Sequence, residues 1–426
     1  MFSALIPHLR RLKNRFPTLY GCLGSVGRNF INRWLGTYPK VMANEIGAVA
    51  DVLRGNQWNM AYGKGLAHER LEEAFAEYVG VRHAVAVNTG GMALQMSMRA
   101  LGLKPGHEVV LQVDTCSATA FAVMNAGCTP IFSDISDQTF MLPIDSFAGL
   151  IGTDTKAVIA THLWGNPENM AEINRVCESM DVLVIEDACL ALGAKSGEKM
   201  AGASGHAGVF SFGCLKPIQG GEGGMVVTDD DALAGELRSL RHWGDRTMEY
   251  GIRDTTQLAW NGRMSEIVAA VVNEQLKGYP LHLANLREAV LEFQNYIEKI
   301  DGLDLVMGAT DQPQDCAFTQ VVLRLDETKF GHDKSWFRDE LSRRGVAIWH
   351  ANFELINSLS FFRSDHWRDW VLKGDIDRIA RNFHGGFPVA QRVFDSTGVG
   401  LPKTHFLSKA RLRHLIKQID TLVVRH

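Results

Sequence analysis

The sequence predicts an α/β protein with a large, mostly parallel sheet domain followed by a smaller α+β domain. Short apolar runs alternate with segments of helical spacing from about residue 66 to residue 227. Nearly continuous apolar strands that alternate with helices are typical of parallel sheets covered on both faces. A chain of 426 residues is also long enough for two packed domains.

The expected elements of the large domain begin with a helix in which Leu71, Phe75 and Tyr78 have helical spacing. An apolar strand at 84–87 then stops at a glycine turn, and a second helix runs from about 92 to 100. Further short apolar strands follow at 109–113, 130–132, 157–160, 182–185, 209–212 and 225–227. We expect a binding site at their carboxyl ends, as in other sheets of this kind.

The pattern changes after about residue 280. We expect a long helix at 281–300, a strand at 318–325, a charged helix at 334–344 and a closing helix at 409–424. The sequence therefore indicates a large domain at 45–280 and a small domain at 281–426. The boundary is soft, because no Pro- or Ser-rich linker marks it.

The first 44 residues form a separate basic extension, because they hold seven Lys or Arg and no acidic residue. The remaining chain has 37 basic residues against 48 acidic ones. We expect an ordered extension lying on an acidic body, with a targeting peptide or a membrane anchor as the alternatives.

Composition narrows the functional classes. Hydrophobic residues at 46% and charged residues at 22% are ordinary for a soluble enzyme and exclude a disordered or fibrous chain. The seven scattered cysteines show neither zinc spacing nor a disulfide framework, so we expect a cytoplasmic protein without a metal site. No apolar run approaches the ~20 residues of a membrane span, and we expect no membrane or nucleic-acid partner.

Three segments carry candidate chemistry. Lys216 follows one apolar run and precedes a glycine cluster and another strand. A partly desolvated amine there is nucleophilic toward an aldehyde, although a surface lysine in a loop is the alternative.

Asp187 follows the apolar run 182–185, where a buried carboxylate needs a cation. A protonated pyridine nitrogen would serve, while a helix N-cap or a magnesium ligand are the alternatives. The Asn88–Met92 turn opens a helix and suits a phosphate group.

These segments resemble the DegT/DnrJ/StrS family of sugar aminotransferases that depend on pyridoxal 5'-phosphate (PLP), over about residues 45–280. The matching segments, in the family's order, are Gly90-Gly91-Met92-Ala93-Leu94, His162-Leu163-Trp164-Gly165, Glu186-Asp187-Ala188, Ser211-Phe212 with Lys216 and Gly221-Glu222-Gly223-Gly224, and Asn261-Gly262-Arg263-Met264. The resemblance implies PLP fold type I, the aspartate aminotransferase-like architecture.

The resemblance also implies a role for each site residue. Lys216 would carry PLP as a Schiff base and move protons, and Asp187 would pair with the pyridine nitrogen. The phosphate would be bound by Ser211, by the turn residues Gly90, Gly91 and Met92, and by Asn261 of a second subunit. The expected protein is a homodimer with composite sites, which passes an amino group from glutamate or glutamine to a keto sugar or keto cyclitol.

Two positions depart from the family. Cys116 replaces the aromatic residue that stacks on the ring, and Leu190 replaces the Gln or His near the ring hydroxyl.

Within the same fold, a PLP-dependent sugar dehydratase is the alternative activity, but those relatives carry His at the lysine position. A PLP-binding regulator without turnover is the alternative from another class. His162 could touch the cofactor or be satisfied by local backbone, and the role of Glu222 stays open between ordering its turn and contacting a donor.

Overall fold

The computed structural model describes residues 43–56, 58, 66–245, 255, 257–351, 354–371 and 373–423. Almost all of the basic extension therefore lies outside the described residues. Among the helices of the described residues, none is both long enough and apolar enough to cross a membrane.

The large domain is built on a seven-stranded sheet with the order β1-β9-β8-β5-β4-β2-β3. The strands are β1 (His83–Val87), β2 (Glu108–Gln112), β3 (Thr129–Ser133), β4 (Thr155–Thr161), β5 (Leu183–Asp187), β8 (Ala207–Ser211) and β9 (Gly224–Thr228). Each apolar run expected as a strand forms one of them. The β3, β2, β4, β5 and β8 strands pair in parallel, and β9 runs antiparallel to both neighbours. The prediction of a mostly parallel sheet is confirmed.

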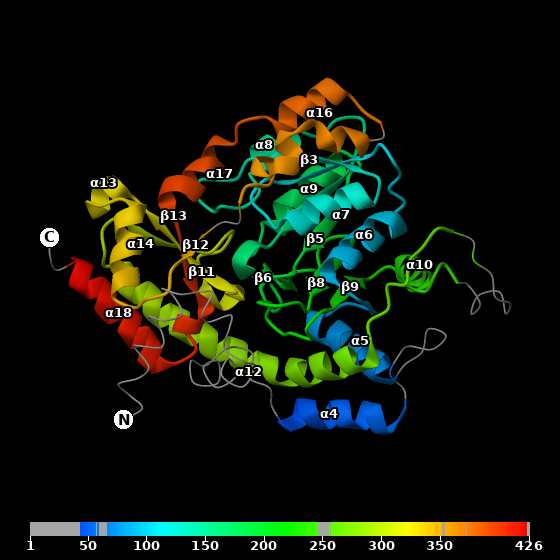
Figure 1. Ribbon diagram of the computed structural model, residues 1–426, viewed down its shortest axis with the longest axis horizontal. Helices are drawn as coiled ribbons and strands as arrows, with labels where there is room; N and C mark the ends of the chain where they lie inside the picture. The colour runs from blue at the N-terminus through cyan, green and yellow to red at the C-terminus, as the bar shows by residue number, and fades with distance from the viewer. Residues whose placement is uncertain are drawn as a thin grey trace, which may run out of the picture. The chain divides into compact units, whose positions relative to one another are not determined.

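Helices cover both faces of this sheet (Figure 1). One face packs against α6 (Gly90–Ala100), α7 (Ser117–Asn125), α9 (Met170–Ser179) and α10 (Asp231–Arg241). The other face packs against α5 (Leu66–Val79) and the first half of α12 (Glu266–Ile297). Shorter elements are α4 (Ala43–Arg54), α8 (Ile144–Ala148), and the small hairpin of β6 (Lys195–Ser196) and β7 (Lys199–Met200). The strands are buried on both faces, which explains why their sequences are apolar without alternation.

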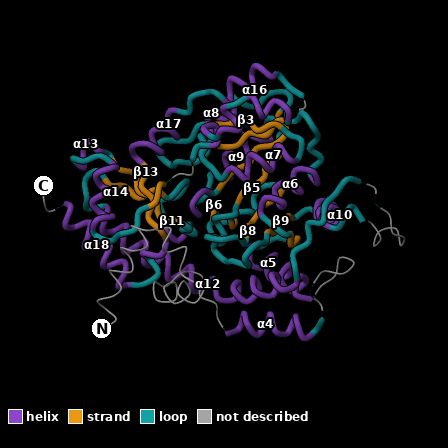
Figure 2. The backbone as a smooth tube through the Cα atoms, viewed as in Figure 1, coloured by secondary structure: helices purple, strands orange, loops and turns teal. Residues whose placement is uncertain are grey.

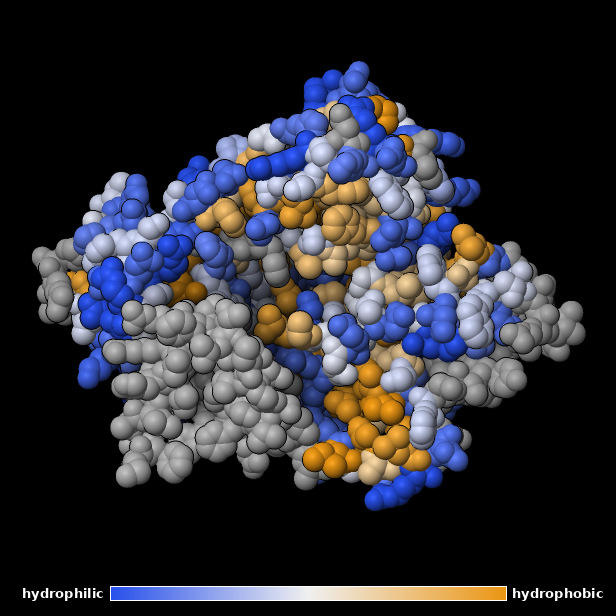
Figure 3. Space-filling view, in the orientation of Figure 1, coloured by the Kyte–Doolittle hydropathy of each residue, from blue (hydrophilic) through white to orange (hydrophobic). Residues whose placement is uncertain are grey.

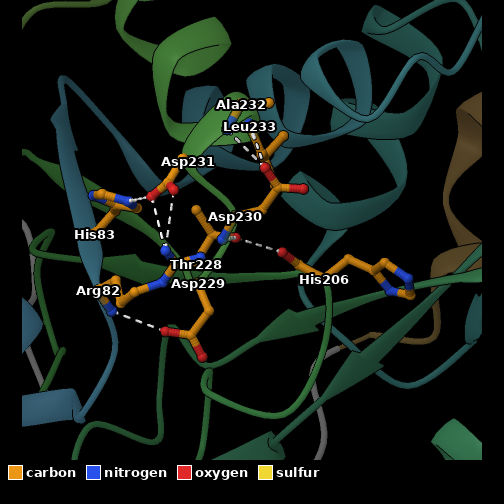
Figure 4. Close-up of polar contacts among 9 residues, drawn as sticks. All are labelled: Arg82, His83, His206, Thr228, Asp229, Asp230, Asp231, Ala232 and Leu233. Atoms are coloured by element: carbon orange, nitrogen blue, oxygen red, sulfur yellow. Dashed lines mark hydrogen bonds and ion pairs between the residues drawn. The ribbon is translucent and has the colours of Figure 1, made fainter.

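The turn between β9 and α10 secures the edge strand β1 (Figure 4). Asp230 caps α10 by accepting the N–H groups of Ala232 and Leu233. Asp231 accepts from the ring of His83 at 2.6 Å and from the guanidinium of Arg82 at 3.0 Å. These partners, His83 first, hold the pKa of Asp231 below its ordinary value. The cluster ties the start of β1 to the neighbouring strand.

The helix α12 belongs to both domains (Figure 2). Its 32 residues run through Pro280, so the boundary that we expect near residue 280 falls inside one helix. Leu276 and Leu283 pack in the core of the large domain. Leu286 and Phe293 pack in the core of the small domain.

The small domain is an antiparallel four-stranded sheet with the order β10-β11-β13-β12. Its strands are β10 (Leu303–Val306), β11 (Gln320–Leu325), β12 (Trp349–His350) and β13 (Gly398–Pro402), and its helices are α13 (Glu327–Phe330), α14 (Lys334–Arg343) and α18 (Lys409–Val423). The strand β11 and the helices α14 and α18 confirm the expected elements.

A segment between β12 and β13 returns to the large domain. It contains α15 (Ser360–Arg363), α16 (Ile376–Phe383) and α17 (Pro388–Arg392). The amide of Asn382 accepts from the N–H of Phe132 at 2.8 Å and donates to its carbonyl at 2.9 Å, as a neighbouring strand would. The exposed edge of β3 is thereby covered, which is one way in which proteins prevent edge-to-edge association.

Candidate active site

The expected site residues lie at the carboxyl edge of the large sheet. Asp187 ends β5, Ser211 ends β8, and Gly90 opens the helix that follows β1. Cys116 follows β2 and is the N-cap residue of α7. Parallel strands bring their carboxyl ends to one edge of the sheet, so residues that are distant in sequence come together there.

Asp187 is a buried carboxylate with neutral partners. It is 6% exposed, and it accepts from the hydroxyl of Thr119 at 3.0 Å and from the N–H of Cys189 at 3.2 Å. Within the described part of the chain, no Lys, Arg or His forms an ion pair with it. Because a buried carboxylate is costly without a cation, this arrangement suits a cationic ligand nitrogen.

The first turn of α6 and the end of β8 form a cradle for an anion. Thr89 caps α6 by accepting the N–H of Met92 at 3.0 Å. This N–H, which we expected to bind phosphate, is therefore already donated within the chain. The N–H groups of Gly90 and Gly91 are the first two of the helix, where no intrahelical acceptor exists.

Glycine is required at position 90 by close packing. A Cβ there would lie 2.7 Å from the Cβ of Ser211 and 3.2 Å from the sulfur of Cys189. Gly90 therefore allows the helix terminus to approach the hydroxyl of Ser211. The cradle offers two amides and one hydroxyl, which is a donor set for a phosphate group.

Lys216 lies half-buried in the loop between β8 and β9. The N–H of Gly220 donates to the carbonyl of Phe212 at 2.8 Å and closes this loop. Leu215, directly before the lysine, has a left-handed backbone with φ of 65° and a side chain that is 60% exposed. The start of this loop lies beside the cradle, because the N–H of Gly213 donates to the hydroxyl of Ser211 at 3.4 Å.

Cys189 is a site residue that sequence reasoning missed. Its sulfur lies beside the position of a Cβ on Gly90, and its N–H binds Asp187. It therefore lies between the cradle and the carboxylate. Burial raises the pKa of this thiol well above its ordinary value, and the nearby Asp187 and Cys116 raise it further. The thiol stays protonated, so it does not compete with Lys216 as a nucleophile.

Thr119 is a second site residue that sequence reasoning missed. Its hydroxyl donates to Asp187, and its own N–H donates to the carbonyl of Cys116 at 2.9 Å. Cys116 thereby lies one helical turn before the threonine that binds the carboxylate. A threonine in a short apolar helix carries no signal of such a role in the sequence.

Asn261 lies at the surface of the same edge. Its carbonyl accepts from the side chain of Asn88 at 3.5 Å, and the carbonyl of Gly262 accepts from the N–H of Asn88 at 2.8 Å. The side chain of Asn261 is exposed. This position leaves it free of the buried network around Asp187.

His162 and Trp164, which belong to one of the matching segments, are both buried inside the protein. His162 is fully buried, with Nδ1 accepting from the N–H of Glu168 at 3.0 Å and Nε2 donating to Glu186 at 2.9 Å. Trp164 is buried at 1% exposure and packs against Phe140. Local bonding and packing therefore account for both.

Three further observations describe the chemistry around the site. The carboxylate of Glu222 lies 3.6 Å from the position that a Cβ on Gly213 would occupy, within the lysine loop. Among the described residues, no group of His, Cys, Asp and Glu could hold a metal ion. The six cysteines in the described part of the chain are free thiols that form no disulfide bond.

Comparison with known proteins adds independent findings. The family model of the DegT/DnrJ/EryC1/StrS aminotransferase family matches residues 39–367. GDP-perosamine synthase of Caulobacter vibrioides is 37% identical over 254 residues, which cover 59% of this chain and 67% of that protein.

Solved structures share the fold. An aminotransferase from Psychrobacter cryohalolentis superposes with a TM-score of 0.80 at 24% identity, covering 92% of this chain and 99% of its own. DesI, solved in the presence of its TDP-sugar product, gives a TM-score of 0.70 at 26% identity, covering 90% of this chain and 92% of its own. The expected fold class is confirmed.

Proposed function

The chain belongs to the DegT/DnrJ/EryC1/StrS aminotransferase family, and we propose that it transfers an amino group from glutamate or glutamine to a keto sugar carried on a nucleotide. Membership makes it an aminotransferase of the amino-sugar and cyclitol class. The family implies PLP as the cofactor. A keto cyclitol is the second acceptor class.

The observation that carries the proposal is the shared site of Asp187, Lys216 and the Gly90–Ser211 cradle. The cradle would hold the phosphate of PLP, and the buried Asp187 would meet the ring nitrogen. When bound, PLP supplies an aldehyde that takes up the amino group and a ring that withdraws electrons. Both ends of the cofactor thus find the chemical group that they need.

The residues would divide the work as follows. Thr119 and the N–H of Cys189 fix the orientation of Asp187, which holds a proton on the ring nitrogen. The amine of Lys216 would hold the cofactor covalently and, once the substrate amine has displaced it, would act as the base that moves a proton at the substrate's Cα.

The proposed acceptor follows from the relatives. The curated relative is named for a GDP-linked amino sugar, and DesI was solved with a TDP-sugar product. Two different nucleotides therefore occur among similar proteins, while a sugar diphosphate is common to both names. We propose a nucleotide-linked sugar without assigning its base.

The proposed working unit is a homodimer in which Asn261 binds the neighbour's phosphate. Exposed apolar side chains on α4, α5 and α12 support such an assembly, and apolar side chains gather on the face drawn in Figure 3. The exposed side chains on these three helices include Ile46 at 64%, Leu66 at 57% and Leu281 at 70% exposure. Exposed apolar surface of this kind marks interfaces more often than isolated residues do.

The first experiment tests the lysine. We expect the purified protein to be yellow, and borohydride to fix the cofactor on Lys216 in a form that peptide mass spectrometry detects. The variant Lys216→Ala should lose this adduct while it keeps its fold. An unchanged adduct in the variant would refute the proposed role.

The second experiment identifies the acceptor. The protein is first converted to its amino form with excess glutamate or glutamine, and the donor is removed. Keto sugars, keto cyclitols and nucleotide-linked keto sugars are then screened for return of the initial absorption spectrum. A response to cyclitols alone would replace the proposed acceptor with the second class.

The third experiment tests the composite site by mixing Lys216→Ala and Asn261→Ala subunits. Each heterodimer would contain one complete site, so exchange should restore activity toward half of the wild-type value per heterodimer. Both parent homodimers should be impaired, the lysine variant most. Verified exchange with activity no higher than the average of the parents would place Asn261 outside the neighbour's site.

A further inference from the structure

A second lysine, Lys403, contacts the backbone of the proposed cofactor lysine. Lys403 follows β13 of the small domain and is 7% exposed. Its ammonium donates to the carbonyl oxygen of Lys216 at 3.2 Å, although the two residues are 187 positions apart. The side chain of Lys403 therefore connects the small domain with the lysine loop of the large domain.

The peptide group that Lys403 contacts has a single polar atom. Residue 217 is proline, so the peptide between Lys216 and Pro217 has a carbonyl and no N–H. Hydrogen bonding can fix the plane of this peptide only through its oxygen. Among the described residues, the ammonium of Lys403 and, at 3.3 Å, the side-chain amide of Gln219 donate to that oxygen.

The backbone before this peptide needs such support. Leu215 has φ of 65°, a conformation that costs a leucine free energy, and its side chain is too exposed to recover that cost by packing. Gln219 is itself anchored, because its N–H and carbonyl both bind the side chain of Gln275 at 2.8 Å. Contacts on the C-terminal side of Leu215 thus hold the loop in this conformation.

A buried ammonium at this position is costly unless its contacts offset the loss of hydration. Burial lowers the pKa of Lys403 to about 8, so the side chain is mostly protonated at pH 7. A hydrogen bond from a charged donor to a carbonyl is stronger than one from a neutral donor. If the side chain at position 403 served packing alone, methionine would serve there as well as lysine.

We propose that Lys403 is a positioning residue, through which the small domain fixes the peptide plane of Lys216 and the direction in which its side chain leaves the loop. The inference rests on the proposed role of Lys216 as the cofactor lysine. An error of about 1 Å in the placement of a reacting group can cost on the order of 10²-fold in rate. Loss of Lys403 should therefore slow the reaction with the amino donor more than it weakens cofactor binding.

The test compares Lys403→Met with a matched control, Lys334→Met. Lys334 is also buried in the small domain at 6% exposure, burial also lowers its pKa to about 8, and it also donates to backbone carbonyls, those of Val393 and Phe394. It contacts no part of the lysine loop in these hydrogen bonds. Both variants lose a buried ammonium, but only one loses the contact with Lys216.

Two readouts are needed. In the protein without cofactor, Lys403→Met should speed amide hydrogen exchange in residues 213–220 by at least ~10-fold, because the loop loses a contact. With cofactor, the single-turnover rate with the amino donor should fall by ~10–100-fold, while the PLP dissociation constant changes less than ~3-fold. The Lys334→Met control should leave both the exchange in this segment and the rate near wild type.

The conservative variant Lys403→Arg retains a charged donor and should recover most of the rate. If Lys403→Met does not fold, Gln219→Leu removes the other donor to the same oxygen and should change both readouts in the same direction. The proposal fails if Lys403→Met behaves like Lys334→Met, or if Lys403→Arg stays as slow as Lys403→Met. Survival of the covalent cofactor link in Lys216→Ala would instead overturn the proposed function, and the exchange measurement would still report on the contact.

Discussion

Two neighbouring carboxylates at the end of β5 face opposite sides of the large sheet, because side chains alternate along a strand. Glu186 accepts four hydrogen bonds: from His162 at 2.9 Å and from the N–H groups of Gly202, Ser204 and Gly205 at 2.9, 2.6 and 2.6 Å. Asp187 accepts two. Glu186 has used its acceptor capacity on the protein itself, whereas Asp187 retains capacity for a ligand. The number of hydrogen-bond donors thus separates Glu186, which the protein itself saturates, from Asp187, which we propose binds the cofactor.

The largest effect should come from Asp187→Asn. An amide cannot hold a proton on the ring nitrogen through its charge, so transamination should fall by about 10²–10³-fold. The thermal midpoint should change little, because the substitution keeps the shape of a side chain with few partners. Initial rates and thermal unfolding of the cofactor-loaded protein measure the two effects.

Thr119→Val serves as its control, because it removes only the hydroxyl that orients the carboxylate. A loss of about 3–10-fold is expected from the missing orientation. Rates for Asp187→Asn within a few-fold of wild type, with the cofactor bound, would contradict the contrast between the two carboxylates.

The opposite pattern is expected of Glu186→Gln. Burial alone would raise the pKa of Glu186, but the hydrogen bonds from His162 and from the backbone amides outweigh it and hold the pKa below its ordinary value of 4.5. Breaking a buried pair of this kind costs about 3 kcal/mol of unfolding free energy. Activity per cofactor-bound molecule should stay within a few-fold of wild type.

The loss of unfolding free energy in Glu186→Gln should depend on pH in a defined direction. The depressed pKa means that the wild-type carboxylate contributes stability above about pH 4.5, and that this contribution disappears as the pH falls through the folded value. Denaturant unfolding of both proteins at pH 7 and pH 4 should therefore show a difference that shrinks toward acid. An equal difference at both values would assign the stability to another cause.

A smaller effect is expected of Glu168→Gln, on the same network as Glu186. The N–H of Glu168 donates to His162, and the carboxyl group is buried at 1% exposure. Burial raises its pKa from 4.5 to about 8, although the N–H of Leu142 opposes the shift. The raised pKa stabilises the fold below pH 4.5, and this contribution is lost between pH 4.5 and pH 8.

Glutamine has no proton to lose, so Glu168→Gln should gain about 1–3 kcal/mol relative to wild type between pH 5 and pH 8. Urea unfolding of both proteins at the two pH values measures this gain. Parallel pH profiles would show that the carboxyl group of Glu168 titrates near its ordinary pKa.

The smallest effect should follow Cys116→Phe, on the side of the sheet that holds Asp187. An aromatic face would restore stacking on the cofactor ring, worth about 0.5–1.5 kcal/mol. The dissociation constant of PLP, measured by fluorescence titration, should stay unchanged or fall by up to about tenfold. A marked rise would mean that the pocket is shaped around the small thiol side chain.

Elements with a strong local pattern could be predicted from the sequence. The strands of the large sheet are buried on both faces, so their apolar runs have no competing explanation, and β5 and β8 were found with their terminal site residues. Two of the motifs likewise place Asp187 at the end of β5 and Ser211 at the end of β8, with Lys216 in the loop that follows β8. Asp187 and Ser211 are the last residues of their strands, where sequence order and position in the sheet coincide.

Other elements have no such pattern. The sequence predicts a helix beginning at residue 281, but α12 begins at Glu266 and runs through Pro280, because both of its halves pack in cores. The strand β13 contains Gly398 and Gly400, and β12 has two residues, so neither shows alternation. Lys403 reaches Lys216, and the sulfur of Cys189 reaches Gly90, through tertiary contacts that no spacing in the sequence encodes.

The continuous helix α12 also determines where the chain can be divided. A cut at residue 280 would split a helix about 48 Å long and would remove Leu283 from the apolar core that it shares with Leu276. Fragments made at that position would each expose a half-helix with an unpacked apolar face. Domain swaps with related enzymes should therefore keep residues 266–297 together, with junctions in the loops on either side of the helix.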